Sequence, residues 1–153
     1  MLKIQDCMKR KVFSVPSTAT VKDAVNLLVQ HHIGLLPVLD TDGRPLGVVG
    51  LHDLLELALP SVIRTMTDVD FVGDFGAVEA YQPTEQILSK PITELMRTVA
   101  VVTEDSGLLR SYALMLQYEL HDMPVIDQDG RLTGIASRVD IGTTILASWG
   151  KKE

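Results

Sequence analysis

The sequence has little of what marks membrane proteins and disulfide-bonded secreted proteins. It contains one cysteine, Cys7, so no disulfide can form within the chain, which fits a reducing compartment. No apolar run approaches the roughly 18 residues that cross a bilayer, and residues 1–10 lack the apolar centre of a signal peptide. We therefore expect a cytoplasmic protein that does not act in a membrane.

Positive charge is also scarce. Lysine and arginine together number 14 against 20 acidic residues, which gives a net charge of -6. The dense basic run at residues 9–11 is short, and such runs are typical of a solvated surface, although a small anion could use one of these residues. Because a surface that binds a nucleic acid duplex usually gathers basic residues on one face, we expect no nucleic acid partner.

The motifs of common catalytic and metal sites are missing as well. There is no Walker loop, no Gly-x-Gly-x-x-Gly segment and no nucleophile elbow. His31 and His32 are adjacent, so on a helix they point about 100° apart and cannot chelate one ion together. The acidic residues between Asp68 and Glu79 lack the spacing of a calcium loop. We therefore expect no metal site, no obligatory cofactor and no catalytic residue.

What the sequence does contain is one segment repeated. Residues 37–53 match residues 124–140 when the numbering is shifted by 87, and eight positions keep the same residue, where chance gives about one. The matching pairs are Pro37/Pro124, Val38/Val125, Asp40/Asp127, Asp42/Asp129, Gly43/Gly130, Arg44/Arg131, Gly47/Gly134 and Asp53/Asp140. Internal duplication predicts two similar halves with a functional cleft between them.

Each half shows the same order of predicted elements: strand, helix, strand, strand, helix. Apolar runs and helical spacing place them at 12–15, 21–31, 36–39, 46–49 and 51–59, and again at 99–102, 106–119, 123–126, 132–137 and 139–147. Thr20, with Asp23 three residues later, predicts a helix N-cap. Gly43, in the turn between the paired strands, predicts a positive φ.

A lead-in segment precedes each half, and a linker separates the halves. Ile4 and Met8 match Ile92 and Met96 at an offset of 88, so the first half carries one extra residue near position 10 or 11. The linker, residues 60–90, is acidic and longer than an ordinary loop. We expect it either to offer a surface to a partner protein or to pack partly as helix.

The candidate site is the point where the last strand of each half meets its last helix. Ser137, with Asp140 three residues later, has the spacing of a helix N-cap, and this alone could explain both residues. The same geometry suits a nucleotide, because free N–H groups at a helix start attract phosphate and a carboxylate can accept from a ribose diol. The first half keeps the carboxylate as Asp53 but has Gly50 in place of the serine. If helix capping were the only role of this pair, the first half should have kept a capping side chain at the position of Gly50.

The ordered set of these features, occurring twice, resembles the cystathionine-β-synthase (CBS) domain. The resemblance covers residues 1–59 and 91–149 as two tandem domains, with residues 60–90 as the linker between them. It implies an α/β fold of the α+β kind, in which each domain runs strand-helix-strand-strand-helix and the two pack as a pseudo-two-fold module. It further implies a regulatory module that binds adenine nucleotides in two related clefts.

For the second cleft, the resemblance implies a nearly complete binding site. Ser137 would contact phosphate and Asp140 would hold the ribose, as in family members. Gly134 keeps the family pattern, Arg138 is available for phosphate, and His121 is expected to line this cleft.

For the first cleft, the resemblance implies a weaker site. Asp53 is kept, but Gly50 stands where a hydroxyl residue is usual, so we expect lower occupancy there. In both clefts the adenine base would lie near the first strand and the proline-containing strand, at Val15, Leu36, Val102 and Met123.

Three classes of function follow. The leading one is a stand-alone sensor that binds AMP, ADP, ATP or a related adenosyl ligand and signals to an effector protein. The second is a structural or docking protein with empty clefts, whose contact surface is the linker around residues 71–75. The third, and weakest, is a nucleotide-processing enzyme that acts through Asp140 or His121.

The resemblance also implies a homodimer. Apolar positions on the final helix of each half could meet across a dimer, or they could close each half's own core. These positions are Leu54, Leu55, Ala58, Ile141, Ile145 and Leu146.

Overall fold

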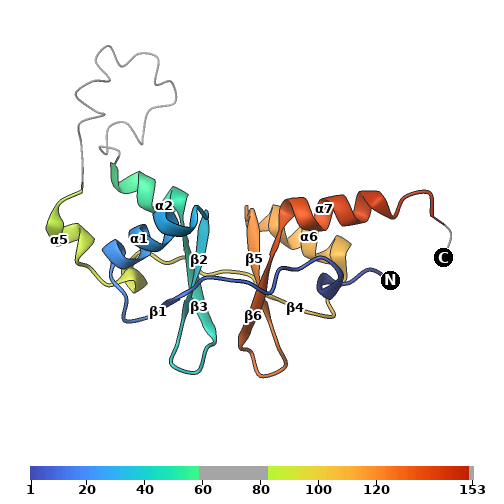
Figure 1. Cartoon of the computed structure of the whole chain (residues 1–153), viewed down its shortest axis with the longest axis horizontal. Coiled ribbons are helices and arrows are strands. Elements are labelled where there is room, and N and C mark those ends of the chain that lie inside the picture. The colour runs from blue at the N-terminus through green and yellow to red at the C-terminus, as the bar shows by residue number, and fades with distance from the viewer. Residues whose placement is uncertain (59–82, 152–153) are drawn as a thin grey trace, which may run out of the picture.

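The computed structural model describes residues 1–58 and 83–151. They form two similar halves, each with a three-stranded sheet, and the two sheets stand side by side in the middle of the molecule (Figure 1). This is the mixed α/β fold of two strand-helix-strand-strand-helix units that the sequence predicts. Of the linker, residues 83–90 are described, and they contain the short helix α5 (Glu85–Leu88). The contact surface expected at residues 71–75 lies outside the described residues.

The two sheets have the same topology and register. In the first, β1 (Val15–Pro16) runs parallel to β2 (Leu35–Leu39), which pairs antiparallel with β3 (Pro45–Gly50). In the second, β4 (Val102–Thr103), β5 (Asp122–Ile126) and β6 (Leu132–Ser137) repeat this arrangement. The first strand of each half is shorter than predicted and begins later, because the residues before it leave the sheet.

The helix α1 begins where its capping residue predicts. Thr20 caps α1 (Val21–His31), since its hydroxyl accepts from the Asp23 N–H at 3.2 Å and the Asp23 carboxylate accepts from the Thr20 N–H at 2.9 Å. The second half has α6 (Leu108–Gln117) in the equivalent place. The final helices are α2 (Leu51–Leu55), extended by a short 3-10 turn η2 (Glu56–Ala58), and α7 (Arg138–Ala147).

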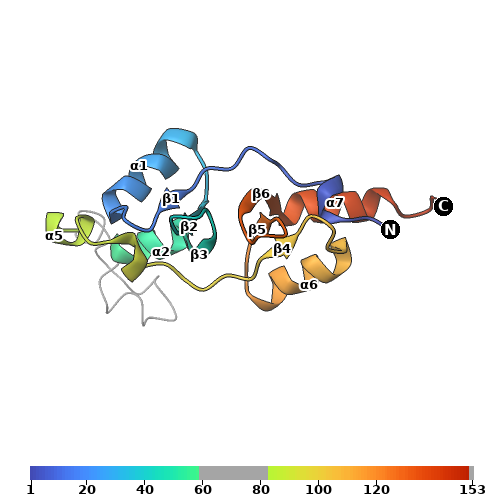
Figure 2. The same cartoon turned by 90° about the horizontal axis from the view of Figure 1, so that it is seen from below.

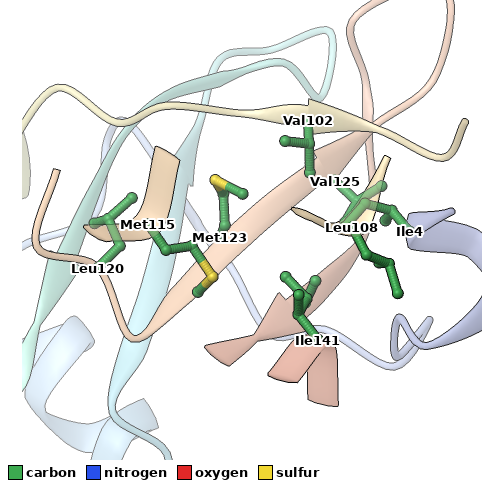
Figure 3. Packing of buried hydrophobic residues seen from close by; sticks show 9 residues of the cluster. Ile4, Val102, Leu108, Met115, Leu120, Met123, Val125 and Ile141 are labelled. Carbon is green, nitrogen blue, oxygen red and sulfur yellow. The ribbon is translucent and has the colours of Figure 1, made fainter. Parts of the chain in front are cut away.

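The lead-in segments are exchanged between the halves. The 3-10 turn η1 (Ile4–Asp6) places Ile4 in the core of the second half, where it packs with Val102, Met123 and Ile141 (Figure 3). The turn η4 (Ile92–Glu94) places Ile92 in the core of the first half. Figure 2 shows both connecting segments crossing from one half to the other. Each core is therefore completed by residues that precede the other half in sequence.

Two repeated glycines allow these crossing segments to lie against the sheets. Lys9 exchanges backbone hydrogen bonds with Ile135 at 2.9 Å, and Arg97 exchanges them with Val48 at 2.8 and 2.9 Å. A Cβ on Gly47 would lie 2.6 Å from the Arg97 carbonyl oxygen, and one on Gly134 would overlap the Lys9 carbonyl oxygen. Since real Cβ atoms do not approach backbone oxygens so closely, this contact accounts for both glycines.

The hairpin tips also join the two halves, which explains the repeated Asp-x-Asp-Gly-Arg turn. Gly43 has a φ of 86° and Gly130 a φ of 83°, as the turn chemistry predicts. Asp40 accepts from the Arg44 N–H at 2.9 Å, and this backbone bond is the main cause that lowers the pKa of its carboxyl. Across the tips, Arg44 Nε donates to the Asp129 carbonyl at 2.9 Å.

Candidate functional site

Two cavities lie between the halves, and each is lined by residues from both. The first cleft, about 640 Å³, is lined by residues 34–35, 50–53, 56, 97 and 119–122. The second cleft, about 440 Å³, is lined by residues 9, 11–13, 33–35, 122, 135, 137 and 140. Gly34, Leu35 and Asp122 line both, so the two clefts are neighbours. Their volumes lie in the range of about 300–1,000 Å³ found for small-molecule sites.

In the first cleft the repeated carboxylate is fully engaged. Asp53 follows the start of α2, and its side chain is only 8% exposed. One carboxylate oxygen, Oδ2, accepts from the Gly50 N–H at 2.8 Å. The other, Oδ1, lies 2.8 Å from Arg97 Nε in an ion pair without hydrogen-bond alignment. A ligand hydroxyl that approached Oδ1 would therefore compete with Arg97 for this oxygen.

In the second cleft the equivalent carboxylate keeps a free acceptor. Ser137 caps α7 as predicted, because its Oγ accepts from the Asp140 N–H at 3.0 Å. Asp140 Oδ2 is buried and has no hydrogen-bond partner. The nearest cation, Lys9 Nζ, lies 3.7 Å away on a side chain that is 68% exposed, and such exposed pairs contribute at most about 1 kcal/mol. A ligand that supplies a hydroxyl donor would satisfy this oxygen.

The two clefts also differ in formal charge. The second cleft balances two lysines against two carboxylates: Lys9 and Lys11 against Asp122 and Asp140. The first cleft sets one arginine against four carboxylates: Arg97 against Asp53, Glu56, Glu119 and Asp122. Because a phosphate group carries negative charge, the second cleft is the better electrostatic match for it.

Asp122 lines both clefts, and its carboxyl group is partly buried. Burial is the main cause that raises the pKa of its carboxyl, and Asp140 raises that pKa further. His121 and Lys9 act in the opposite direction. At the equivalent position the first half has Leu35, so the wall shared by the clefts carries one acidic and one apolar side chain.

His121 lines the first cleft and not the second, which corrects the expectation from the sequence. The clefts are built across the halves, so the segment before β5 faces α2 of the other half. The Arg138 N–H, at the start of α7, donates to the His121 carbonyl at 2.8 Å, as the Leu51 N–H donates to Gly34 at 3.0 Å.

Arg138 and Gly134 lie outside both clefts, although the sequence suggested them as site residues. The Arg138 guanidinium donates through Nη2 to the Leu120 carbonyl at 2.8 Å, so it holds the loop before β5. Gly134 is explained by its close contact with the backbone of Lys9. Both residues therefore contact segments that carry cleft-lining residues, and neither lines a cleft itself.

The four positions expected near the adenine base are buried in the two cores and line neither cleft. Their exposed fractions are 1%, 0%, 3% and 0% for Val15, Leu36, Val102 and Met123. Side chains alternate along a strand, so in β2 and β5 the preceding residues, Leu35 and Asp122, face the clefts instead. Figure 3 shows Val102 and Met123 within the second core.

Lys9, Lys11, Phe13 and Arg97 line the clefts and were missed by the sequence reasoning. The basic run at residues 9–11 was interpreted first as a solvated surface, with a small anion as the alternative use of one of its residues. The repeat held a clue, because Lys9 and Arg97 correspond at the offset of 88 that relates Ile4 and Met8 to the second lead-in. A cation repeated beside each cleft was therefore visible in the sequence.

Within residues 1–58 and 83–151, no three histidine, cysteine or acidic side chains are grouped so that they could hold a metal ion. Over the same ranges, the helices are too short or too polar to traverse a bilayer.

Comparison with known proteins gives matches in both halves. A family model described as the CBS domain matches residues 4–60 and 92–145. The CBS domain-containing protein CBSX2, chloroplastic, of Arabidopsis thaliana is 34% identical over 133 residues, which are 82% of this chain and 55% of that protein. The related CBSX1 is 30% identical over 138 residues, covering 87% of this chain and 58% of its own. The chain thus spans somewhat more than half the length of these two relatives.

Solved structures show the same arrangement. The crystal structure of CBSX2 in complex with AMP matches with a TM-score of 0.70 and 27% identity, covering 96% of this chain and 98% of that one. The CBS domain pair of protein MJ0100, in complex with 5'-methylthioadenosine and S-adenosyl-L-methionine, matches with a TM-score of 0.69 over 97% of this chain and 98% of that one. Its identity is 20%, so that likeness concerns the fold.

Proposed function

Because the chain belongs to the CBS domain family, we propose that it is a regulatory module whose second cleft binds an adenine nucleotide without converting it. The candidates are AMP, ADP, ATP and related adenosyl compounds. CBSX2, whose structure contains AMP, supports this choice of ligand. The module would signal to an effector protein through the arrangement of its two halves.

The observation that carries this proposal is the buried Oδ2 atom of Asp140, which has no hydrogen-bond partner. An unsatisfied buried acceptor costs about 1–3 kcal/mol, so a ligand that donates to it recovers free energy on binding. The ribose of a nucleotide offers two neighbouring hydroxyl donors. We therefore assign the ribose to Asp140.

The phosphate of the same ligand is assigned to Ser137 and the two lysines. Ser137 Oγ uses a lone pair to accept from the Asp140 N–H, which leaves its own proton free to donate. Lys9 and Lys11 line the same cleft and supply positive charge. Ser137 thus serves both as the helix cap and as a phosphate donor.

Calorimetric titration with AMP tests the assignment. We expect Asp140→Ala to weaken binding by about tenfold to a hundredfold, because it removes an acceptor for charge-assisted hydrogen bonds. The matched variant Asp53→Ala should have a smaller effect, because that carboxylate is already paired with Arg97. Equal affinity of the wild type and Asp140→Ala for AMP would overturn the assignment. If chromatography showed that the protein consumes the nucleotide, binding without conversion would be overturned.

A homodimer is part of the proposal, through the outer faces of α2 and α7, which lie along the upper side of the molecule in Figure 1. Leu55 is 61% exposed and Leu146 is 55% exposed, and Val139 and Trp149 add further exposed apolar surface on or next to α7. Three of the positions expected at the dimer interface pack instead in the core of their own half. Ile141 is buried, and Leu54 and Ile145 pack against core residues. A light-scattering mass of two chains would support the dimer.

Location in the cytoplasm stays a prediction. The relatives CBSX1 and CBSX2 are named as chloroplastic proteins. Fractionation of cells that express the protein would decide between these compartments.

A further inference from the structure

Phe13 places an aromatic ring at the wall of the second cleft. It belongs to the crossing segment between η1 and β1, and it lines the cavity together with Lys11 and Val12. Its ring is stacked on the imidazole of His31, the last residue of α1, with 3.7 Å between the ring centroids and 16° between the planes. The ring is therefore held in a fixed orientation.

His31 stacks on the Phe13 ring, and the ammonium of Lys11, an exposed residue, also lies over this ring. His31 does not line the cavity, so it covers the side of the ring that faces α1. The Lys11 ammonium lies 5.7 Å from the centroid of the same ring and does line the cavity. A flat group that stacked on Phe13 would displace this ammonium from the ring, and it would lie in the same cavity as Lys11, Ser137 and Asp140.

The first cleft has no equivalent of this ring. At the offset of 87, Phe13 corresponds to Ala100, and among the described residues no phenylalanine, tyrosine or tryptophan lines the first cleft. The repeat therefore does not require an aromatic residue at this position. Phe13 also packs against the core of the first half, whereas alanine occupies the equivalent place against the core of the second half.

We propose that Phe13, backed by His31, is the base-stacking residue of the second cleft and that it selects ligands with a flat aromatic base. This inference rests on the proposed function, because it concerns the same cleft and the same ligand. The ring would hold the base while Asp140 and Ser137 hold the ribose and phosphate. The base is thereby recognised by Phe13 and not by the four core residues that the sequence suggested.

A comparison of two ligands tests this role. AMP and ribose 5-phosphate share the sugar and the phosphate, but only AMP carries a base. We expect Phe13→Leu to weaken AMP binding by about tenfold, as loss of base stacking typically does, and to leave ribose 5-phosphate binding unchanged. Phe13→Tyr, which keeps the ring, should retain the affinity of the wild type for AMP.

Other outcomes would overturn either the stacking role of Phe13 or the proposed function itself. Unchanged AMP affinity in Phe13→Leu, or an equal loss for both ligands, would overturn the stacking role while leaving the proposed function in place. Absence of any AMP binding by the wild type would instead overturn the proposed function, and the stacking role with it.

A measurement on the wild-type protein covers the case in which Phe13→Leu does not fold. A base stacked on a phenyl ring experiences its ring current, so the proton resonances of the adenine of AMP should move upfield on binding. Adenine resonances that do not move upfield in the bound state would contradict the proposal.

Discussion

The two clefts descend from one repeated segment, yet they offer different chemistry. The first is the larger, about 640 Å³ against about 440 Å³, but Arg97 occupies its carboxylate and its lining is acidic. The second is smaller and balanced in charge, and it holds a carboxylate oxygen without a hydrogen-bond partner. Volume alone would select the first cleft, whereas charge and hydrogen bonding select the second. For a phosphate-bearing ligand, the chemistry of the lining decides.

Local crowding helps to explain why the clefts differ. A Cβ on Gly50 would lie 3.1 Å from the Gly34 carbonyl oxygen and 3.3 Å from a methyl group of Leu35. These are tight contacts, so a serine in this place would push the neighbouring backbone aside. The missing hydroxyl of the first cleft is thus coupled to how closely the end of β3 approaches the start of β2 within the first half.

The largest expected effect is a difference in the free energy of unfolding between Arg97→Ala and Lys9→Ala. Arg97→Ala would leave the buried carboxylate of Asp53 without its cation, and we expect a loss of about 1–3 kcal/mol in the free energy of unfolding. Lys9→Ala should cost less than about 1 kcal/mol, because Lys9 is exposed and lies farther from its partner. Urea denaturation measures both values. Equal losses would contradict the contrast drawn between the two carboxylates.

The same two variants should behave in the reverse order in binding. Lys9→Ala should weaken AMP binding about threefold to tenfold, with a smaller loss at high salt, because a charge near the phosphate is removed. Arg97→Ala should leave binding in the second cleft unchanged, since Arg97 lines the first cleft. Calorimetry at low and high salt provides the test.

A loss of AMP affinity comparable to that of Lys9→Ala is expected from exchanging the cap residues. Ser137→Gly should weaken AMP binding about tenfold through loss of the hydroxyl donor. Glycine is the suitable replacement because it costs a helix start only a few tenths of a kcal/mol relative to serine. Gly50→Ser should not create a second nucleotide site, given the acidic lining and the tight space. Binding of a second equivalent of AMP by Gly50→Ser would show that the hydroxyl alone makes the difference.

The smallest effect concerns Asp122 in the shared wall. Burial raises the pKa of this carboxyl, so its ionised form is disfavoured in the folded state. At about pH 3.5, below the usual pKa, the residue is mostly protonated in both states and its burial costs little. As the pH rises through the window between the usual and the raised pKa, the folded protein loses stability. We expect Asp122→Asn to be more stable than the wild type, by less than about 1 kcal/mol, at about pH 7.

Urea denaturation at the two pH values tests this sign. The advantage of Asp122→Asn should shrink toward zero at the acidic value. An advantage that is the same at both values would mean that ionisation of Asp122 is not its cause.

Much of the scaffold could be predicted because it depends on local chemistry. The Thr20 and Ser137 caps, the positive φ of Gly43 and Gly130, and the register of the repeat all follow from residues close in sequence. The residues that line the second cleft were predictable only in part. Ser137 and Asp140 were found because they sit at a helix start, and they do line the second cleft.

The cleft-lining residues that were not predicted depend on contacts between segments that are distant in sequence. Whether Leu35 or Leu36 faces the cleft depends on which side of the sheet the core occupies, and an apolar run of four residues does not reveal this. Arg138 looked available for phosphate because its bond to the Leu120 carbonyl joins residues 18 apart. His121 was placed in the wrong cleft because the sequence offset shows which residues are equivalent, but not which half each one faces.

The exchanged lead-in segments have a consequence for how the chain acquires its structure during synthesis. The first half lacks Ile92 until residues beyond the linker have left the ribosome, so its core stays open while the rest is being made. Ile4, which precedes the whole first half, must wait for almost the whole second half before it is buried. Contacts so distant in sequence slow folding. The two halves should therefore gain their final structure together and late, and either half expressed alone should lack one wall of its core.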